Sequence, residues 1–201
     1  MLQQTLHPVT LTGERVRLVP LAPEHAPQLF EAGRDPAIWA YFFLRFDAPR
    51  DADRFVSLAL EEQASGTALP FAIEDLGTNR LVGSTRLLDF LPAHRQLEIG
   101  ATWLCPQAWR TRVNSECKYL LLRHCFEELN LLRVQLKTDA RNERSQRAIE
   151  RLGALREGVL RQHRVLPDGF VRDSVVYSIL SNEWPLVKER LESSLAPPSS
   201  T

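Results

Sequence analysis

The chain has 201 residues, enough for one sizeable hydrophobic core or at most two small ones. Hydrophobic residues make up 44% of it and charged residues 25%, which is typical of a globular domain. The 25 basic and 25 acidic residues cancel. A nucleic-acid partner is therefore not expected, because a generic polyanion binder carries a net basic field.

The cysteines and the N-terminus argue against a zinc-binding, secreted or membrane-spanning protein. Cys105, Cys117 and Cys125 form no Cys-x-x-Cys pair, and no histidine completes a zinc spacing, so we expect no metal site. An odd number of cysteines indicates reduced, packed thiols in the cytoplasm. The segment Met1–Thr10 lacks the features of a signal peptide, and no apolar run is long enough for a membrane span, so no membrane partner is expected.

The N-terminal half predicts strands and helices in alternation. Apolar and polar residues alternate along Arg15–Leu21, which indicates a strand, and Pro23 suits the first turn of a helix through about Gly33. Further helices are expected at Ala37–Phe42 and Arg50–Ala64. Three strands should follow, at Phe71–Glu74, Leu81–Leu88 and Leu97–Leu104.

Val113–Leu129 is the strongest predicted helix, and it is apolar around most of its circumference, which predicts burial. It lies between the strands Leu97–Leu104 and Arg133–Thr138. Such a strand–helix–strand unit predicts that the two strands are parallel.

The C-terminal part should contain a helix after Asn142 that ends at Gly153, and then a hairpin. The hairpin comprises Arg156–Val165 and Phe170–Ser181 around Pro167-Asp168-Gly169. A last helix, Glu183–Leu195, precedes a Pro/Ser tail, Ala196–Thr201. We therefore expect one α/β domain over residues 1–201, with a mixed sheet, helices on both faces and a core of about residues 12–184.

Two segments could bind an anion. Pro106–Asn114 joins a strand to the buried helix, and free N–H groups at a helix start, together with Arg110 and Arg112, suit a phosphate. The alternative is an ordinary loop with solvated arginines. In the second segment, Asn142 is expected to cap a helix that has Ser145 in its first turn, where Ser145 either satisfies the helix start or contacts a ligand.

Glu98 is the candidate base. Alternation places Leu97 and Ile99 on one face of their strand and Glu98 on the other. A buried carboxylate there could accept a proton. Judged from the residues alone, an exposed edge position paired with an arginine is favoured instead.

The order of several short blocks resembles the GNAT acetyltransferases, in particular the branch of the RimJ/RimL-type N-terminal acetyltransferases. The blocks are Gly83–Arg86, Leu97–Leu104, Thr111–Lys118, Asn142–Ala154 and Glu157–Arg161, and the resemblance covers roughly residues 12–184. It implies a single GNAT-like domain, whose mixed sheet is mostly antiparallel with one parallel βαβ pair.

The resemblance also implies roles for residues. Glu98 would accept a proton from the amine, and Ser145 would assist the leaving thiolate. Trp39 and Tyr41 would border the acceptor. The residues implied in acetyl-CoA binding are Trp103, Leu104, Gln107, Arg110, Thr111, Arg112, Val113, Asn114, Asn142 and Ser145.

The chain departs from the family pattern at two places. Arg110 and Arg112 stand where most GNAT enzymes have glycines, so the loop should lack glycine-only backbone angles. Ile149 stands where many have a tyrosine proton donor. The expected function is acetyl-CoA-dependent N-acetylation of a primary amine, at a protein or peptide N-terminus or in a small molecule. The alternative is a catalytically inactive GNAT-like module that binds CoA or a protein, and a homodimer remains open in either case.

Overall fold

The computed structural model describes residues 5–196 as an α/β fold built on one sheet. The sheet has eight strands in the order β1-β2-β3-β4-β5-β6-β8-β7. The strands are β1 (Leu11–Thr12), β2 (Val16–Pro20), β3 (Ala68–Asp75), β4 (Arg80–Leu91), β5 (Gln96–Leu104), β6 (Arg133–Asp139), β7 (Leu155–Val165) and β8 (Val171–Leu180). The helices are α1 (Ala26–Ala32), α2 (Pro49–Ala64), α3 (Arg112–Arg123), α4 (Glu143–Arg151) and α5 (Trp184–Leu195).

The predicted parallel pair is confirmed. β5 and β6 run parallel with Gln96 opposite Arg133 and Glu98 opposite Gln135, and α3 forms the crossover between them. All other neighbouring strands are antiparallel, including the hairpin of β7 and β8. The mixed, mostly antiparallel sheet is therefore present as expected.

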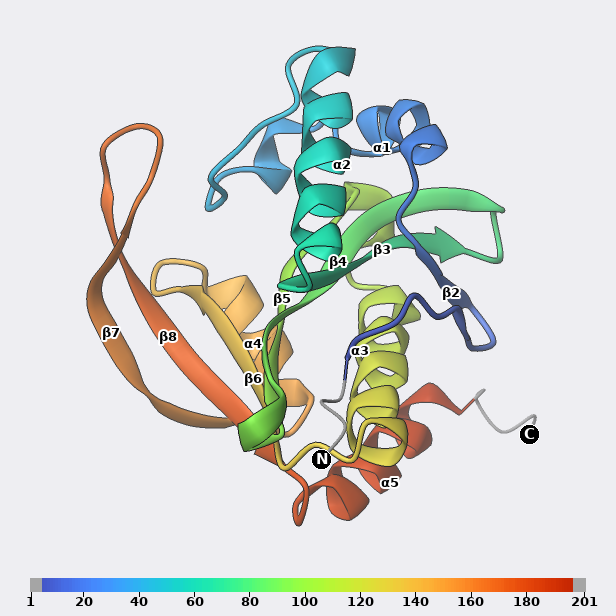
Figure 1. Cartoon of the computed structure of the whole chain (residues 1–201), viewed down its shortest axis with the longest axis vertical. Coiled ribbons are helices and arrows are strands. Elements are labelled where there is room, and N and C mark those ends of the chain that lie inside the picture. Colours follow the sequence, from blue (N-terminus) through green and yellow to red (C-terminus); the bar gives the residue numbers. More distant parts are fainter. Residues whose placement is uncertain (1–4, 197–201) are drawn as a thin grey trace.

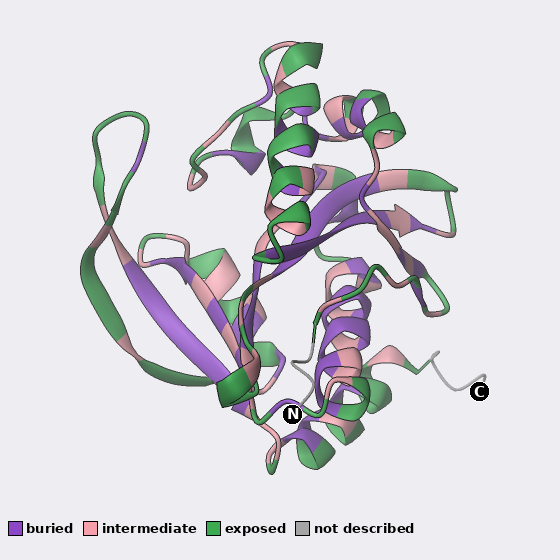
Figure 2. Cartoon of the chain, viewed as in Figure 1, coloured by how far each residue is buried: buried purple, intermediate pink, exposed green. Residues whose placement is uncertain are grey.

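Helices cover both faces of the sheet, as predicted (Figure 1). Phe71 and Ile73 of β3 belong to the core on the α3 side, while Ala72 belongs to a second core beneath α1 and α2. This division follows from the period-two alternation of side chains along a strand. β8 is mostly buried, whereas β7 is mostly exposed at the edge of the sheet (Figure 2).

An irregularity in β5 opens the middle of the sheet. Ala101 has a left-handed φ of 48°, and between Gly100 and Trp103 two residues of β5 stand opposite one residue of β4. Such a bulge bends a strand and increases its twist. The pairing with β6 ends at Glu98 and Gln135, although β5 continues to Leu104, so the two strands separate beyond this point.

Some expected element bounds were wrong. The helix expected at Ala37–Phe42 is only a 3₁₀ turn, Pro36–Ile38, because the Trp39 indole donates to the Gly33 carbonyl and anchors this segment in the core. Strand β1 was not expected, and the helix expected at Val113–Leu129 ends at Arg123 and continues as a π-helical turn, His124–Glu128. Most of the expected C-terminal tail, residues 197–201, lies outside the described residues.

Candidate active site

Glu98 is buried in the interior of the sheet, so the exposed edge position paired with an arginine was wrong. Its strand β5 lies between β4 and β6, and the residue is only 7% exposed. Gly100 makes room for the carboxylate, since a Cβ at that position would lie 2.7 Å from Glu98 Oε1. The side chain therefore sits beside the bulge, where β5 and β6 begin to separate.

Two side chains of β6 hold the Glu98 carboxylate. Lys137 Nζ lies 2.7 Å from Oε2, and Gln135 Nε2 donates to the same oxygen at 3.4 Å. Lys137 also lies 3.7 Å from Asp89, at the exposed end of this network. The ammonium thus occupies a hydrogen-bonding position at Oε2, of the kind that an amine must take if Glu98 is to remove its proton.

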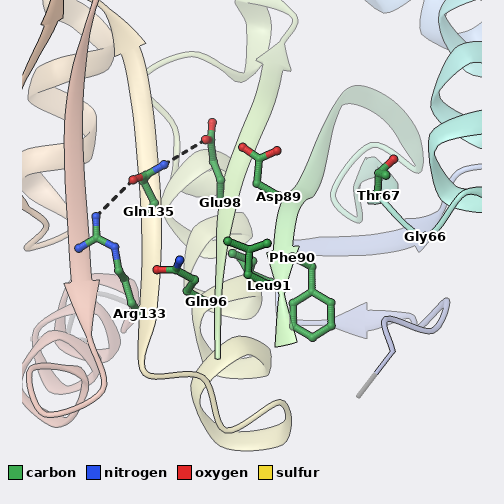
Figure 3. A pocket seen from close by; sticks show the side chains of 10 residues that line it. Gly66, Thr67, Asp89, Phe90, Leu91, Gln96, Glu98, Arg133 and Gln135 are labelled. Carbon is green, nitrogen blue, oxygen red and sulfur yellow. Dashed lines mark hydrogen bonds between the residues drawn. The ribbon is translucent and has the colours of Figure 1, made fainter. Parts of the chain in front are cut away.

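A cavity of about 490 Å³ opens beside Glu98 (Figure 3). It lies on the α2 side of the sheet, since Gly66 and Thr67, in the turn that follows α2, contribute to its wall. The other lining residues are Asp89, Phe90, Leu91, Gln96, Leu97, Glu98, Arg133 and Gln135. This volume falls in the range of small-ligand sites.

A second lysine lies beneath the bulge. Lys118 of α3 is 5% exposed, and its Nζ donates to Thr102 Oγ1 at 2.5 Å. Thr102 and Thr85 are hydrogen-bonded to each other at 2.7 Å. Burial lowers the pKa of Lys118, and the Glu98 carboxylate partly counteracts this effect. Among residues 5–196, no carboxylate lies within ion-pair distance of the Lys118 ammonium.

The loop before α3 contains a left-handed residue in spite of its missing glycines. Arg110 has φ 61°, a left-handed angle that favours glycine but is not restricted to it, so the structure does not contradict the expectation that the loop lacks glycine-only angles. The αL region is sparsely populated but accessible to L-residues. The Arg110 side chain is exposed, and in the described part of the chain it makes no ion pair. It is therefore available to an anionic ligand.

Arg112 is engaged elsewhere. Its Nη2 donates to the Leu195 carbonyl and lies 3.4 Å from Glu14 Oε2. Thr111 is the N-cap of α3, with Oγ1 accepting from the Val113 N–H at 3.2 Å. The remaining residues that the resemblance connects with acetyl-CoA differ in exposure: Gln107 is exposed, Asn114 is half-buried, and Val113, Trp103 and Leu104 are buried.

The predicted cap of α4 is confirmed. Asn142 Oδ1 accepts from the Ser145 N–H at 3.0 Å, and Ser145 is half-buried in the first turn. Ile149, one turn later, is 7% exposed and belongs to the core on the α3 side. The Arg144 guanidinium lies 3.8 Å from the centre of the Trp109 ring, so the start of α4 contacts the loop before α3. The structure therefore brings the two candidate anion-binding segments together.

The two aromatic candidates for substrate contact occupy different environments. Trp39 is 5% exposed and packs against Phe46 and Trp103 in the core beneath α1 and α2. Tyr41 is half-buried, and its ring lies 5.5 Å from the Arg141 guanidinium, which pairs with Asp139 at the end of β6. Only Tyr41 lies where an external molecule could contact it.

Sequence reasoning missed Lys118, Lys137 and the group around Asp139. The chain has only three lysines, and two of them surround Glu98, which could have drawn attention to these positions. Period-two alternation also places Lys137 on the same face of β6 as Gln135. The contact with Glu98 itself depends on the parallel register of β5 and β6, which no local pattern gives.

In residues 5–196, no group of histidine, cysteine, aspartate or glutamate side chains is arranged to hold a metal ion. Within the same residues, every helix is too short or too polar to span a bilayer.

Comparison with known proteins gives consistent matches. Residues 15–155 match the family described as acetyltransferase (GNAT) domain. The chain is 33% identical over 104 residues to YdaF of Bacillus subtilis (strain 168), provisionally named a ribosomal N-acetyltransferase; the match covers 52% of this chain and 56% of YdaF.

Two solved structures have the same fold. A provisionally assigned acetyltransferase from T. thermophilus is 43% identical, with a TM-score of 0.86 over 96% of this chain and 100% of that one. RimJ of Mycobacterium smegmatis, in complex with CoA-disulfide, superposes with a TM-score of 0.80 at 22% identity, covering 93% of this chain and 95% of RimJ.

Proposed function

Because this chain belongs to the GNAT acetyltransferase family, we propose that it transfers the acetyl group of acetyl-CoA to a primary amine. The amine belongs to a protein or peptide N-terminus, or to a small molecule. The observation that carries the proposal is the buried Glu98, which lines a cavity and belongs to the last pair of β5 and β6 before the two strands separate. The relative YdaF and the RimJ/RimL-like order of motifs favour a protein N-terminus, and with it a cytoplasmic location.

In this proposal the amine attacks the thioester carbonyl directly. Glu98 accepts a proton from the nitrogen, and backbone N–H groups of β5 beyond its pairing with β6 donate to the developing oxyanion. The carbon–sulfur bond then breaks, and the Ser145 hydroxyl donates to the thiolate. Because a thiol has a pKa near 8.5, this leaving group needs only modest help.

Lys137 imposes a condition on this reaction. Its ammonium lies 2.7 Å from Glu98 Oε2 and must move before an acceptor amine can bind at that oxygen. An α-amine, with a pKa near 8, loses its proton more readily than a lysine with a pKa near 10.4. The carboxylate of Glu98, already stabilised by one cation, is therefore better matched to an α-amine.

Two features of the structure support a binding site for acetyl-CoA. Arg110 is exposed with a left-handed backbone, and the first turn of α4 contains Asn142 and Ser145. We propose that these residues and the start of α3 contact acetyl-CoA. Arg112 is a weaker candidate because the Leu195 carbonyl and Glu14 already engage its guanidinium.

A second candidate function is a GNAT-like module without turnover. The buried Ile149 in place of a tyrosine donor and the Glu98–Lys137 pair favour it. Thiol release from acetyl-CoA with a panel of α-amines, small amines and lysine peptides separates the two proposals. Turnover with at least one amine supports the enzyme, whereas binding of acetyl-CoA without any turnover supports the module.

A further inference from the structure

Two arginines share one buried carboxylate at the end of β6. Asp139 is 2% exposed, and Arg141 occupies both of its oxygens: Nη2 lies 2.8 Å from Oδ2, while Nε and the backbone N–H donate to Oδ1 at 3.0 and 2.9 Å. Such a bidentate pair uses most of the acceptor capacity of one carboxylate. Only the remaining acceptor capacity of Asp139 is available to Arg172.

Arg172 is consequently an incompletely neutralised cation. Its Nε is 3.9 Å from Asp139 Oδ2 and donates to Ser174 Oγ at 3.1 Å, while its side chain is only 12% exposed. Among residues 5–196 no other carboxylate lies within ion-pair distance of it. Burial lowers the pKa of Arg172, and the charges of Arg164 and Arg141 act in the same direction. A partly buried ion without a full partner is costly, so an anionic ligand would be stabilised here.

Two neighbouring acidic groups, Asp168 and Asp173, form no ion pair with Arg172. Asp168 Oδ1 accepts from the backbone N–H of Phe170, and Asp173 Oδ1 accepts from that of Gln162. Glu98 acts on Arg172 only at longer range and is paired with Lys137. The local balance therefore favours an incoming anion.

The surroundings of Arg172 are open and partly aromatic. Phe43, 46% exposed, has its ring centre 5.5 Å from the Arg172 guanidinium, and Phe170, 41% exposed, lies against Arg141 at 3.6 Å. Arg164 pairs with Arg172 across the β7–β8 hairpin and is exposed without an ion pair in the described part of the chain. Exposed rings, the unpaired Arg164 guanidinium and the incompletely neutralised Arg172 are suited to a peptide with an acidic side chain.

This place is a short distance along the sheet from Glu98. Arg172 contacts Asp139, which lies two residues beyond Lys137 on β6, or about 7 Å at ~3.3 Å per residue. An extended peptide advances by a similar distance for each residue. If its terminal amine replaces the Lys137 ammonium at Glu98, the side chain of its second or third residue lies near Arg172.

We propose that the acceptor is a polypeptide N-terminus with an acidic side chain at its second or third residue, and that Arg172 binds this side chain. The inference rests on the proposed function, since it places the acceptor amine at Glu98. It adds a class of acceptor and a residue that selects it.

The test uses matched peptides and ratios. Peptides with Asp, Asn or Lys at position two, and separately at position three, are compared as acceptors of the native protein and of Arg172→Gln, Arg172→Lys and the control Arg190→Gln. Arg190 is an exposed residue of α5, on the other side of the sheet, so its replacement changes the net charge equally. The ratio of kcat/KM for the Asp and Asn peptides cancels any difference in the folded fraction.

We expect the native protein and Arg190→Gln to prefer the Asp peptide at one of the two positions by about tenfold or more, mostly in KM, as one charge-assisted hydrogen bond would give. Arg172→Gln should reduce this ratio to near one, and Arg172→Lys should keep part of it. The preference should also weaken as salt is raised. Equal use of Asp and Asn peptides by the native protein, or an unchanged ratio in Arg172→Gln, would overturn the inference.

Equilibrium binding of the same peptides in the presence of CoA separates this inference from the proposed function. Tighter binding of the Asp peptide that depends on Arg172, without turnover, supports the acidic subsite and contradicts the enzyme. Turnover without any charge preference supports the enzyme and contradicts the acidic subsite.

Discussion

At the scale of single residues, the site is defined by the environment of one carboxylate. Glu98 is buried, held by Lys137 at 2.7 Å and flanked by Gly100, where a Cβ would collide with it. A general base needs to be in hydrogen-bond reach of the proton it accepts. Lys137 shows that this position accommodates an ammonium group.

Replacing Glu98 with glutamine should lower turnover at neutral pH by about 10²–10⁴, with little change in acetyl-CoA affinity, because the amide cannot accept the proton. The loss should shrink at high pH, where the free amine no longer needs a base. Steady-state rates between pH 6.5 and 9.5 measure this. A loss that does not depend on pH would point to structural damage.

Glu116→Gln is the matched control for Glu98→Gln. Glu116 is 4% exposed and accepts from the backbone N–H groups of Glu14 and Arg15, outside the cavity. Its replacement should lower stability and leave turnover per folded molecule unchanged.

Ser145→Ala should reduce turnover by about tenfold or more at unchanged affinity for acetyl-CoA, because Ile149 leaves no tyrosine donor in α4. The Asn142 cap bonds the backbone of Ser145 and not its hydroxyl, so stability should change little. Full activity of the folded variant would remove Ser145 from the mechanism.

Ile149→Tyr in the Ser145→Ala background gives a sharper check. The two positions are one turn apart and can share a face, so a tyrosine that reaches the sulfur should restore part of the rate. Ile149 is buried, however, and folding must be measured alongside activity.

At the scale of elements, the two arginines in the loop between β5 and α3 differ: one has an unusual backbone angle, and the other has an engaged side chain. Arg110 has the left-handed backbone that glycine adopts without cost, while Arg112 fastens the start of α3 to Leu195 and Glu14. The two arginines therefore have different expected roles, although both stand in place of family glycines.

Arg110→Gly should change the free energy of unfolding by no more than about 1 kcal/mol, since relief of the left-handed strain offsets the greater freedom of the unfolded chain. It should weaken the binding of CoA more than the binding of a pantetheine fragment that lacks the nucleotide phosphates. Calorimetric titration measures both affinities, and equal losses for the two ligands would mean that Arg110 does not contact phosphate. Arg112→Ala is the comparison: it should cost more stability and less CoA affinity.

At the scale of the whole molecule, the stability of the protein should depend on pH in two ranges. Burial lowers the pKa of both His124 and His163. As pH falls below about 6.5, the unfolded chain binds protons at these histidines more readily than the folded protein does, so the free energy of unfolding decreases.

Asp139 adds a second range: burial alone would raise its pKa, but hydrogen bonds from Arg141 hold it below the ordinary value. Its stabilising contribution is complete above about pH 4 and is lost below it.

Urea unfolding between pH 8 and pH 5 should therefore show a decreasing midpoint, with a smaller decrease in the double variant His124→Gln, His163→Gln. A slope unchanged by both substitutions would contradict the assignment to these histidines. The control is His94→Gln, at an exposed position in a surface turn.

The sequence by itself determined the local structure and the family. Period-two alternation gave most strands, the apolar circumference of the helix after Val113 gave the buried crossover, and Asn142 gave the cap of α4. These features depend on residues close together in the chain. The order of the motifs added the GNAT fold, and the match over residues 15–155 confirms it.

The tertiary structure decided what surrounds the candidate residues. Glu98 is buried because β4 and β6 pair on either side of β5, and it meets Lys137 only through the parallel register. The Arg112 guanidinium donates to the carbonyl of Leu195, 83 residues away in the chain. Arg172 has no full ion-pair partner because Arg141 already pairs with Asp139. Local patterns fix which face a side chain takes; the partners on that face come from distant segments, which only the folded sheet brings together.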